Sequence, residues 1–223
     1  MSNETSVRGR GRPARVSRAK IIAAARAMDP SVLSIQAVAS ALGVDRKTIR
    51  YHVRDRDELT RLVAQDAFRA ELALADVDEQ IEWQASLRSF ARVVRDASVA
   101  SGYGSNLELA GAALDLEALG PAEVASRALL QAGFAQIDAS GLLRTVGVLS
   151  TGFARELLAE ERDGLHAQRD TVQRALAERE DATLGALRAL AAGANDLDSR
   201  SAFEFALDVV VVGAQQTLVA PRD

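Results

Sequence analysis

A group of cations within residues 33–59 has the types and spacing that binding to a polyanion requires. The stretch reads LSIQAVASALGVDRKTIRYHVRDRDEL, and Arg46, Lys47 and Arg50 fall on the outward face of a short helix expected after Asp45. A helix fits the major groove of B-DNA, where Arg or Lys donates to O6 and N7 of guanine. The pattern predicts a DNA contact, although an ordinary helical hairpin with a charged outer face also fits it.

The elements that must position these cations are two short helices that meet at Gly43. Ser34 is expected to cap the first helix and Asp45 the second, because short polar side chains accept the free N–H groups of a helix start. Ala39 is small enough for the helices to cross closely, and Gly43 allows a sharp turn. The apolar positions of this unit are Val38, Leu42, Val44 and Ile49. This spacing is typical of a helix-turn-helix.

Flanking helices complete the N-terminal unit. Ser17 is a candidate N-cap for a helix that Asp29-Pro30 should end, because a residue before proline is pushed out of the helical region. A longer helix is expected from Asp55 or Arg56 onward. Its buried stripe is predicted to contain Leu59, Leu62, Val63 and Phe68.

The rest of the chain has helical periodicity. Apolar residues recur at three and four positions through 81–99, 124–130, 142–158, 172–190 and 203–218. The β-branched run 209–212 lies inside the last of these segments, whose length favours a helix that is buried on most sides. The sequence therefore predicts an all-α fold, with three short helices followed by about six or seven longer ones.

Charge divides the chain into a basic part and an acidic part. Residues 1–63 hold 13 Lys and Arg against six acidic residues, a balance of +7, and residues 64–223 hold 14 against 25, a balance of −11. A basic segment beside an acidic body indicates that the segment meets a polyanion. We expect a disordered basic arm over 1–16, a helix-turn-helix domain over 17–63 and a larger helical domain over 64–223.

Several classes of protein are excluded or disfavoured by what the sequence lacks. Without cysteine there is no disulfide or thiolate metal site, and His52 and His166 are too far apart in sequence for helical metal spacing. The apolar run 209–214 is too short to cross a bilayer, and the arginine-rich start does not resemble a secretory signal. We expect a cytoplasmic protein that has no metal or cofactor and does not contact a membrane. The sequence has neither a nucleophile elbow nor a phosphate-cradling glycine loop, so we expect no enzyme activity.

Three short blocks give the N-terminal unit a specific resemblance. Residues 39–44 read ASALGV, 48–53 read TIRYHV and 54–59 read RDRDEL, preceded by IIAAA at 21–25. Together these blocks resemble the signature of the TetR family of bacterial transcriptional regulators over residues 17–63. Residues 138–160 and 203–208 resemble the two long helices of the tetracycline-repressor-like subgroup, which form a four-helix bundle in a homodimer.

The resemblance implies roles for individual residues. Those that match base readers are Gln36, Arg46, Lys47 and Arg50. Those that match phosphate contacts are Ser34, Thr48, Tyr51, His52 and Arg56. Many family members have an aromatic residue where this chain has Arg50, so both base reading and phosphate contact remain open for that residue.

The expected basic arm over residues 1–16 contains a short arginine- and glycine-containing motif. Arg10-Gly11-Arg12-Pro13 is similar to the core of an AT-hook, in which Arg10 and Arg12 enter a narrow minor groove. A solubilising tail is the alternative interpretation.

For the acidic domain, the resemblance implies dimerisation and a pocket for a small-molecule effector. The candidate pocket residues are Trp83, Phe90, Arg92, Tyr103, Asn106, Gln131, Thr151 and Arg155. Taken singly, Trp83 and Phe90 also fit a core position, and Arg88, Arg92 and Arg155 fit a surface or an ion pair. For the homodimer, we expect the stripe Leu142, Leu143, Val146, Leu149, Phe153 and Leu157 to pair with its copy, together with the 203–218 helix.

The resulting hypothesis is a regulator that binds a palindromic or pseudo-palindromic double-stranded DNA operator and is a repressor released by a small molecule. Two alternatives are an activator of the same fold and an architectural DNA-binding protein without an effector. An architectural protein would bind weakly, with a steep dependence on salt and little discrimination between sequences.

Overall fold

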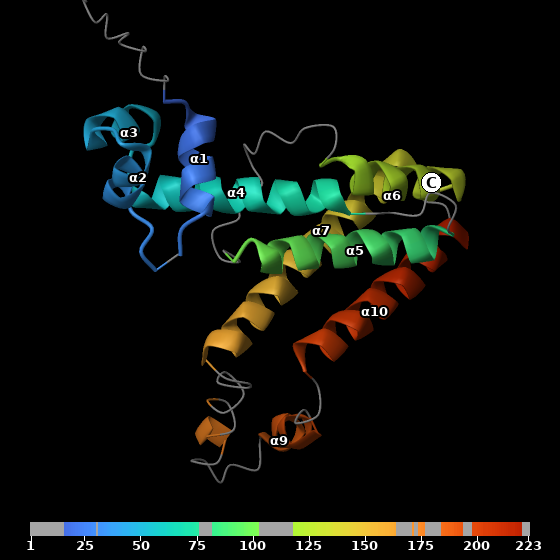
Figure 1. The fold of residues 1–223 in the computed structure, drawn as a ribbon. Coiled ribbons are helices and arrows are strands. Elements are labelled where there is room, and N and C mark those ends of the chain that lie inside the picture. Colours follow the sequence, from blue (N-terminus) through green and yellow to red (C-terminus); the bar gives the residue numbers. More distant parts are fainter. Residues whose placement is uncertain are drawn as a thin grey trace, which may run out of the picture. The chain divides into compact units, whose positions relative to one another are not determined.

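The computed structural model describes residues 16–29, 31–75, 82–102, 118–163, 171, 174–176, 184–193 and 198–219 (Figure 1). All regular secondary structure in these ranges is helical, which confirms the predicted all-α class. Contacts divide the chain into two compact units, Met1–Val63 and Ala64–Asp223, so that the division lies within helix α4, Arg56–Leu74. None of the described helices is long and apolar enough to span a membrane.

The first unit contains α1 (Arg18–Arg26), α2 (Ile35–Leu42), α3 (Arg46–His52) and the first two turns of α4. Each of the three short helices begins at the predicted cap. The Ser17 hydroxyl accepts the N–H of Lys20 at 3.3 Å, the Ser34 hydroxyl that of Ala37 at 3.1 Å, and the Asp45 carboxylate that of Lys47 at 2.6 Å. Such caps stabilise a helix by about 1 kcal/mol each.

The end of α1 differs from the expectation. The helix stops at Arg26, three residues before Asp29, where the sequence predicted the stop. The Asp29 carboxylate instead accepts the backbone N–H of Ser31 at 2.8 Å and its hydroxyl at 2.6 Å. This local turn favours a non-helical backbone at Asp29.

The turn between α2 and α3 depends on Gly43. Its φ of 64° lies in the left-handed region, and its N–H closes the last turn of α2. The N–H of Val44 donates to the carbonyl of Ala39 at 3.0 Å, which completes the cap. The core beneath this turn is formed by Ile21, Ala25, Leu33, Ile35, Val38, Ala39, Ile49, Val53, Leu59 and Val63.

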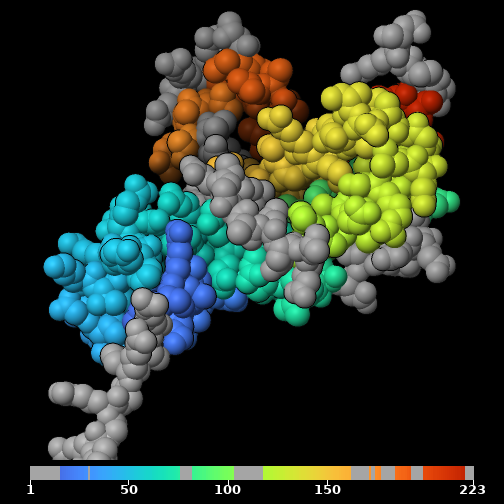
Figure 2. Space-filling view, turned by 90° about the horizontal axis from the view of Figure 1, so that it is seen from above, coloured from blue at the N-terminus to red at the C-terminus, as the bar shows by residue number. Residues whose placement is uncertain are grey.

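The second unit is organised around α5 (Trp83–Ala100). This helix packs against α6 (Gly120–Gln131), α7 (Gln136–Asp163) and α10 (Ser199–Val219), as Figure 1 shows. In the space-filling view, the side chains of α6 in yellow-green lie against those of α7 in yellow (Figure 2). Helix α9 (Gly185–Gly193) precedes α10, and the predicted segment 172–190 is described only in part.

The core of this unit joins α5, α6, α7 and α10. Its largest buried members include Trp83, Leu87, Leu129, Phe203 and Leu207. The hydroxyl of Ser150 on α7 lies 2.8 Å from the carbonyl oxygen of Ala91 on α5, so a polar contact also fixes the two central helices together. The other face of α5 packs on the second half of α4 through Phe68, Leu72, Val94 and Ala97.

The valine run 209–212 is helical, as its flanks predicted. The expectation of burial on most sides is wrong for the single chain. Val211 is 6% exposed, whereas Val209 is 57% and Val212 61% exposed. Because valines on successive positions of a helix point in different directions, only one side of the run can face the core.

Candidate nucleic-acid interface

Helix α3 turns almost all of its side chains outward. Ile49 is its one buried residue, whereas Arg46, Lys47, Thr48, Arg50 and Tyr51 are exposed. Within the described part of the chain, Arg46, Lys47 and Arg50 have no acidic partner. An α-helix with its side chains is about 10–12 Å in diameter, which matches the width of the major groove. The three cations are therefore free to donate to an external acceptor.

The other predicted base reader, Gln36, is exposed in the first turn of α2. Gln36 and the cations of α3 thus lie on two helices joined by one turn, whose geometry Gly43 fixes. Direct packing between α2 and α3 makes this pair of helices one element.

Tyr51 is the most exposed large hydrophobic side chain among the described residues of the unit, at 88%. Its ring stands edge-on to that of His52, with centroids 5.3 Å apart and planes at 86°, and His52 itself is half-buried. Because the Tyr51 ring is so exposed, it contributes little hydrophobic stabilisation to the fold, and its hydroxyl is available to an acceptor outside the chain.

The remaining predicted phosphate contacts lie at helix starts or on the outer face. Ser34 is half-buried and uses its hydroxyl oxygen as the cap of α2, which leaves its proton available. Thr48 is exposed on α3, and Arg56 is exposed as the first residue of α4. The arm residues Arg10 and Arg12 lie outside the described residues.

The acidic residues beside these cations are engaged in capping. Asp45 caps α3, and Asp55 accepts the N–H of Glu58 at 2.8 Å. Glu58 in turn accepts the backbone N–H of Arg54 at 2.8 Å, and this donor, against the effect of burial, holds the pKa of the carboxyl below its ordinary value. Sequence reasoning gave Glu58 no role, although the Asp-x-x-Glu spacing from Asp55 resembles a capping box and was the available signal.

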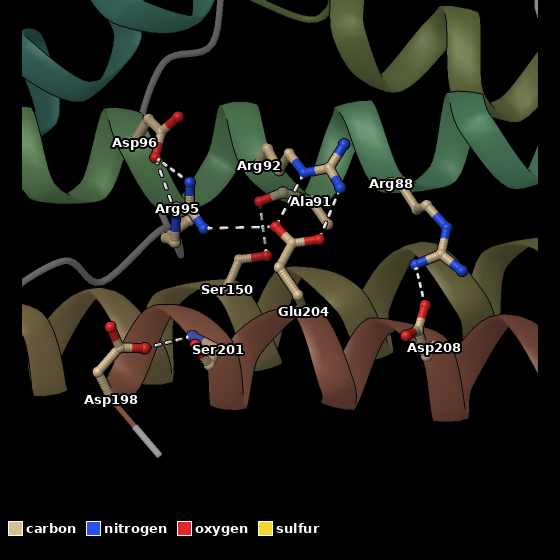
Figure 3. Close-up of polar contacts among 10 residues, drawn as sticks. All are labelled: Arg88, Ala91, Arg92, Arg95, Asp96, Ser150, Asp198, Ser201, Glu204 and Asp208. Atoms are coloured by element: carbon tan, nitrogen blue, oxygen red, sulfur yellow. Dashed lines mark hydrogen bonds and ion pairs between the residues drawn. The ribbon is translucent and has the colours of Figure 1, made fainter. Parts of the chain in front are cut away.

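The predicted pocket residues of the second unit lie in different environments. Trp83 is buried edge-on against Phe134, with centroids 4.9 Å apart, and Phe90 is half-buried between two apolar clusters. Arg92 forms a bidentate ion pair with Glu204 of α10, and Arg88 pairs with Asp208 at 2.7 Å (Figure 3).

The other pocket candidates that the structure describes lie on α6 and α7. Gln131 is exposed at the end of α6, and the Thr151 hydroxyl lies 3.1 Å from the carbonyl oxygen of Gly147 on its own helix. Tyr103 and Asn106 lie outside the described residues. Arg155 borders an open hollow of about 570 Å³, whose described lining is Leu149, Gly152, Phe153, Arg155, Glu156 and Ala159, all on α7.

The α7 stripe expected to pair with a second copy packs in part within its own unit. Val146 is fully buried, and the rings of Phe153 and Phe203 meet with centroids 5.5 Å apart. Leu142, Leu143 and Leu149 also pack against the core cluster. The most exposed apolar side chains on α7 and α10 are Ile137, Val148, Phe205, Val209 and Val212, and the last three belong to the 203–218 segment that was expected to pair. Val146 serves the internal core, whereas pairing of the half-buried α7 residues with a second copy stays a prediction.

Among the described residues, no group of three or more His, Asp or Glu side chains gathers where a metal ion could bind.

The sequence matches no protein-family model and no curated protein. Solved structures do resemble the fold. Apo ActR from Streptomyces coelicolor is 21% identical, with a TM-score of 0.67, over 94% of this chain and 99% of that one. ActR in complex with actinorhodin is 22% identical, with a TM-score of 0.67, over 92% and 99%. A variant of TetR from Acinetobacter baumannii AYE, in complex with minocycline, is 23% identical, with a TM-score of 0.59, over 91% and 98%. The chain therefore has the fold of TetR-family transcriptional regulators.

Proposed function

We propose that this chain, which has the TetR-type fold, is a sequence-specific DNA-binding transcriptional regulator. One observation carries the proposal: α3 buries only Ile49 and presents Arg46, Lys47 and Arg50, none with an acidic partner among the described residues, beside the exposed ring of Tyr51. A stable surface helix usually spreads such charges over ion pairs, whereas a recognition helix keeps them for a groove.

In this proposal Gln36, Arg46 and Lys47 read base edges, because they are exposed on the two helices that the turn holds together. Other residues donate to phosphate oxygens and set the register of the protein on the DNA without reading its sequence. These residues are Ser34, Thr48, Tyr51, His52 and Arg56. Arg50 serves one of these two purposes.

The regulator acts as a homodimer in the cytoplasm, on an operator with two half-sites. Phe205, Val209 and Val212 are exposed on α10 by 66%, 57% and 61%, at spacings of four and three residues, so they form one apolar stripe. Val148 on α7 is 67% exposed, and α7 packs against α10. A second copy would cover this surface about a two-fold axis, and in the DNA-bound dimer the two recognition helices must lie about 34–36 Å apart, one turn of DNA, to enter successive major grooves.

Control by a small molecule is the second part of this proposal. ActR and the TetR variant have been solved with actinorhodin and minocycline, respectively. We extend this property to the helical unit 64–223 and propose that effector binding releases the repressor from its operator. The effector must bind the released arrangement better than the DNA-bound one, because equal affinity for both would shift nothing.

The test is binding to the DNA upstream of the protein's own gene, compared with a scrambled duplex at physiological salt. We expect tight binding to the first duplex and weak binding to the second. Changing Arg46→Ala together with Lys47→Ala should abolish the preference. The matched control, Arg127→Ala with Arg200→Ala, removes the same charge from the second unit and should leave the preference intact. Equal, weak and strongly salt-dependent binding to both duplexes would instead favour an architectural protein.

A further inference from the structure

We infer that Glu58 positions α3, the helix proposed to read DNA. It does so by linking the point where the chain leaves α3 both to α1 and to the first turn of α4. The inference rests on the proposed function, since it concerns how the DNA-reading face is held. Glu58 touches no base or phosphate in this account and acts through Arg54 and Arg18.

The carboxylate of Glu58 receives donors from two directions. Its Oε2 accepts the backbone N–H of Arg54 at 2.8 Å and the Nε of the same residue at 3.2 Å. Its Oε1 accepts Nη2 of Arg18, on α1, at 3.2 Å. The side chain of Glu58 is only 13% exposed, whereas those of Arg18 and Arg54 are 52% and 78% exposed. Glu58 is therefore the mostly buried centre of the cluster that it forms with Arg18 and Arg54, and the two arginines are its exposed partners.

The backbone contact lies directly after the reading helix. Val53, the C-cap of α3, is extended and 1% exposed, and its N–H donates to the carbonyl of Ile49 at 3.0 Å. The next N–H, that of Arg54, lies beyond the helix and donates to the Glu58 carboxylate at 2.8 Å. The carboxylate thus fixes the backbone at the first residue after the cap.

Glu58 is itself held in place by the start of α4. Its N–H donates to the carboxylate of Asp55 at 2.8 Å, and the N–H of Leu59, a fully buried residue, donates to the carbonyl of Asp55 at 3.2 Å. The carboxylate is consequently presented from a capped helix start rather than from a free side chain. Such a start also favours negative charge, because its N–H groups carry partial positive charge.

A short helix needs this support more than a long one. Helix α3 has seven residues, too few for stability on its own, and within the helix only Ile49 is buried. Its N-terminal end is held by Gly43 and the Asp45 cap, and its C-terminal end by Val53 and the Glu58 contacts. If the C-terminal end of α3 is released, its last turn, which carries Arg50, should move relative to its first turn, which carries Arg46.

The direction in which DNA affinity changes when Glu58 is replaced distinguishes a positioning role from an effect of its charge alone. Glu58 brings a negative charge close to a polyanion, so removal of that charge alone should strengthen DNA binding. Loss of positioning should weaken it. The neighbouring Asp57 is exposed in the same turn and supplies the matched control, since its removal changes charge without disturbing the Arg54 contact.

The experiment compares Glu58→Ala and Asp57→Ala in the full chain. Amide hydrogen exchange at Arg54 is measured without DNA, and affinity is measured for a duplex that the wild-type protein selects from a random-sequence pool. For Glu58→Ala we expect exchange at Arg54 to rise at least tenfold and affinity to fall roughly tenfold or more, as loss of charge-assisted hydrogen bonds implies. For Asp57→Ala we expect unchanged exchange at Arg54 and unchanged or tighter binding.

Glu58→Gln covers the case in which the alanine variant does not fold. Its amide oxygen can still accept the N–H of Arg54, while the charge pairs with Arg18 and Arg54 are lost, so we expect an intermediate loss of affinity. Glu58 variants that are folded and bind DNA as tightly as Asp57→Ala would overturn the inference, as would unchanged exchange at Arg54 in Glu58→Ala. A wild-type protein that selects no duplex would refute the proposed function instead, and exchange at Arg54 would still decide whether Glu58 holds this end of α3.

Discussion

Arg92 on α5 and Glu204 on α10 form a bidentate ion pair across 112 residues of sequence, with Nε to Oε1 at 3.0 Å and Nη2 to Oε2 at 2.6 Å (Figure 3). The same carboxylate lies 3.9 Å from Nη1 of Arg95, whose guanidinium covers the ring of Phe203 at 4.5 Å. Arg95 is only 8% exposed and pairs otherwise with Asp96. The negative charge of Glu204 therefore lies close to two cations of α5, the exposed Arg92 and the buried Arg95.

Glu204→Gln should destabilise the second unit by about 1–2 kcal/mol. An exposed ion pair contributes only about 0.2–1 kcal/mol, but loss of Glu204 also leaves the enclosed charge of Arg95 less well compensated. Asp208→Asn, which removes a more exposed carboxylate that pairs with Arg88, should cost less than about 1 kcal/mol and is the matched control. Urea unfolding of both variants measures the difference, and an equal cost for the two would show that Arg95 does not depend on Glu204.

Stability should fall in acid partly through Glu204. Its hydrogen bond with Arg92 holds the pKa of this carboxyl below its ordinary value, although burial acts in the opposite direction. A carboxyl with a lowered pKa in the folded state stabilises the protein above the pKa of the unfolded chain, and this contribution disappears as pH falls. The stability difference between wild type and Glu204→Gln should therefore be full near pH 7 and shrink below about pH 5. Unfolding measured at a series of pH values tests this, and a difference that stays constant down to about pH 3 would contradict it.

Gly43→Ala should destabilise the first unit by about 1–2 kcal/mol, because a side chain in the left-handed region brings Cβ close to the backbone. Beyond Gly43 and its two chain neighbours, a Cβ at this position would meet no atom within 4 Å, so local backbone strain is the whole of the expected cost. Gly141→Ala is the control. That glycine lies inside α7 with ordinary helical geometry and equally open space, and the change should stabilise by about 0.5–1 kcal/mol. Thermal unfolding of the two variants should move in opposite directions.

Charges placed on the outer side of α10 should prevent self-association without unfolding the chain. Val209→Glu with Val212→Glu changes two exposed residues, whereas Val211→Glu introduces a charge into the core and should give insoluble protein. Sedimentation at micromolar concentration should show a dimer for the wild type and a folded monomer for the double variant. A double variant that remains dimeric would remove this surface from the interface.

The local chemistry of the sequence predicted much of the DNA-binding unit. Ser17, Ser34 and Asp45 cap the helices that their types indicated, and Gly43 takes the left-handed turn, because these features depend on neighbours within a few residues. The helical state of the valine run was equally predictable from its flanks.

Long-range relationships were beyond the same reasoning. Periodicity identified apolar stripes on α7 and α10, but it cannot tell whether Val146 or Val148 faces the chain's own core, since that depends on which helices pack together. The partner of Arg92 lies 112 residues away, and no local spacing points to it. For Glu58 the local spacing from Asp55 was an available signal, whereas its contact with Arg18 on α1 spans 40 residues and was not predictable in this way.

The central claim is that the exposed cations of α3 read a DNA sequence, and selection from a random-sequence duplex library tests it most directly. The wild-type protein should enrich a sequence with two-fold symmetry and half-site centres about one helical turn apart. Arg46→Ala with Lys47→Ala should lose that enrichment, while Arg127→Ala with Arg200→Ala should recover the same sequence as wild type. Retention of bound DNA by the wild-type protein without any enriched sequence would contradict the account.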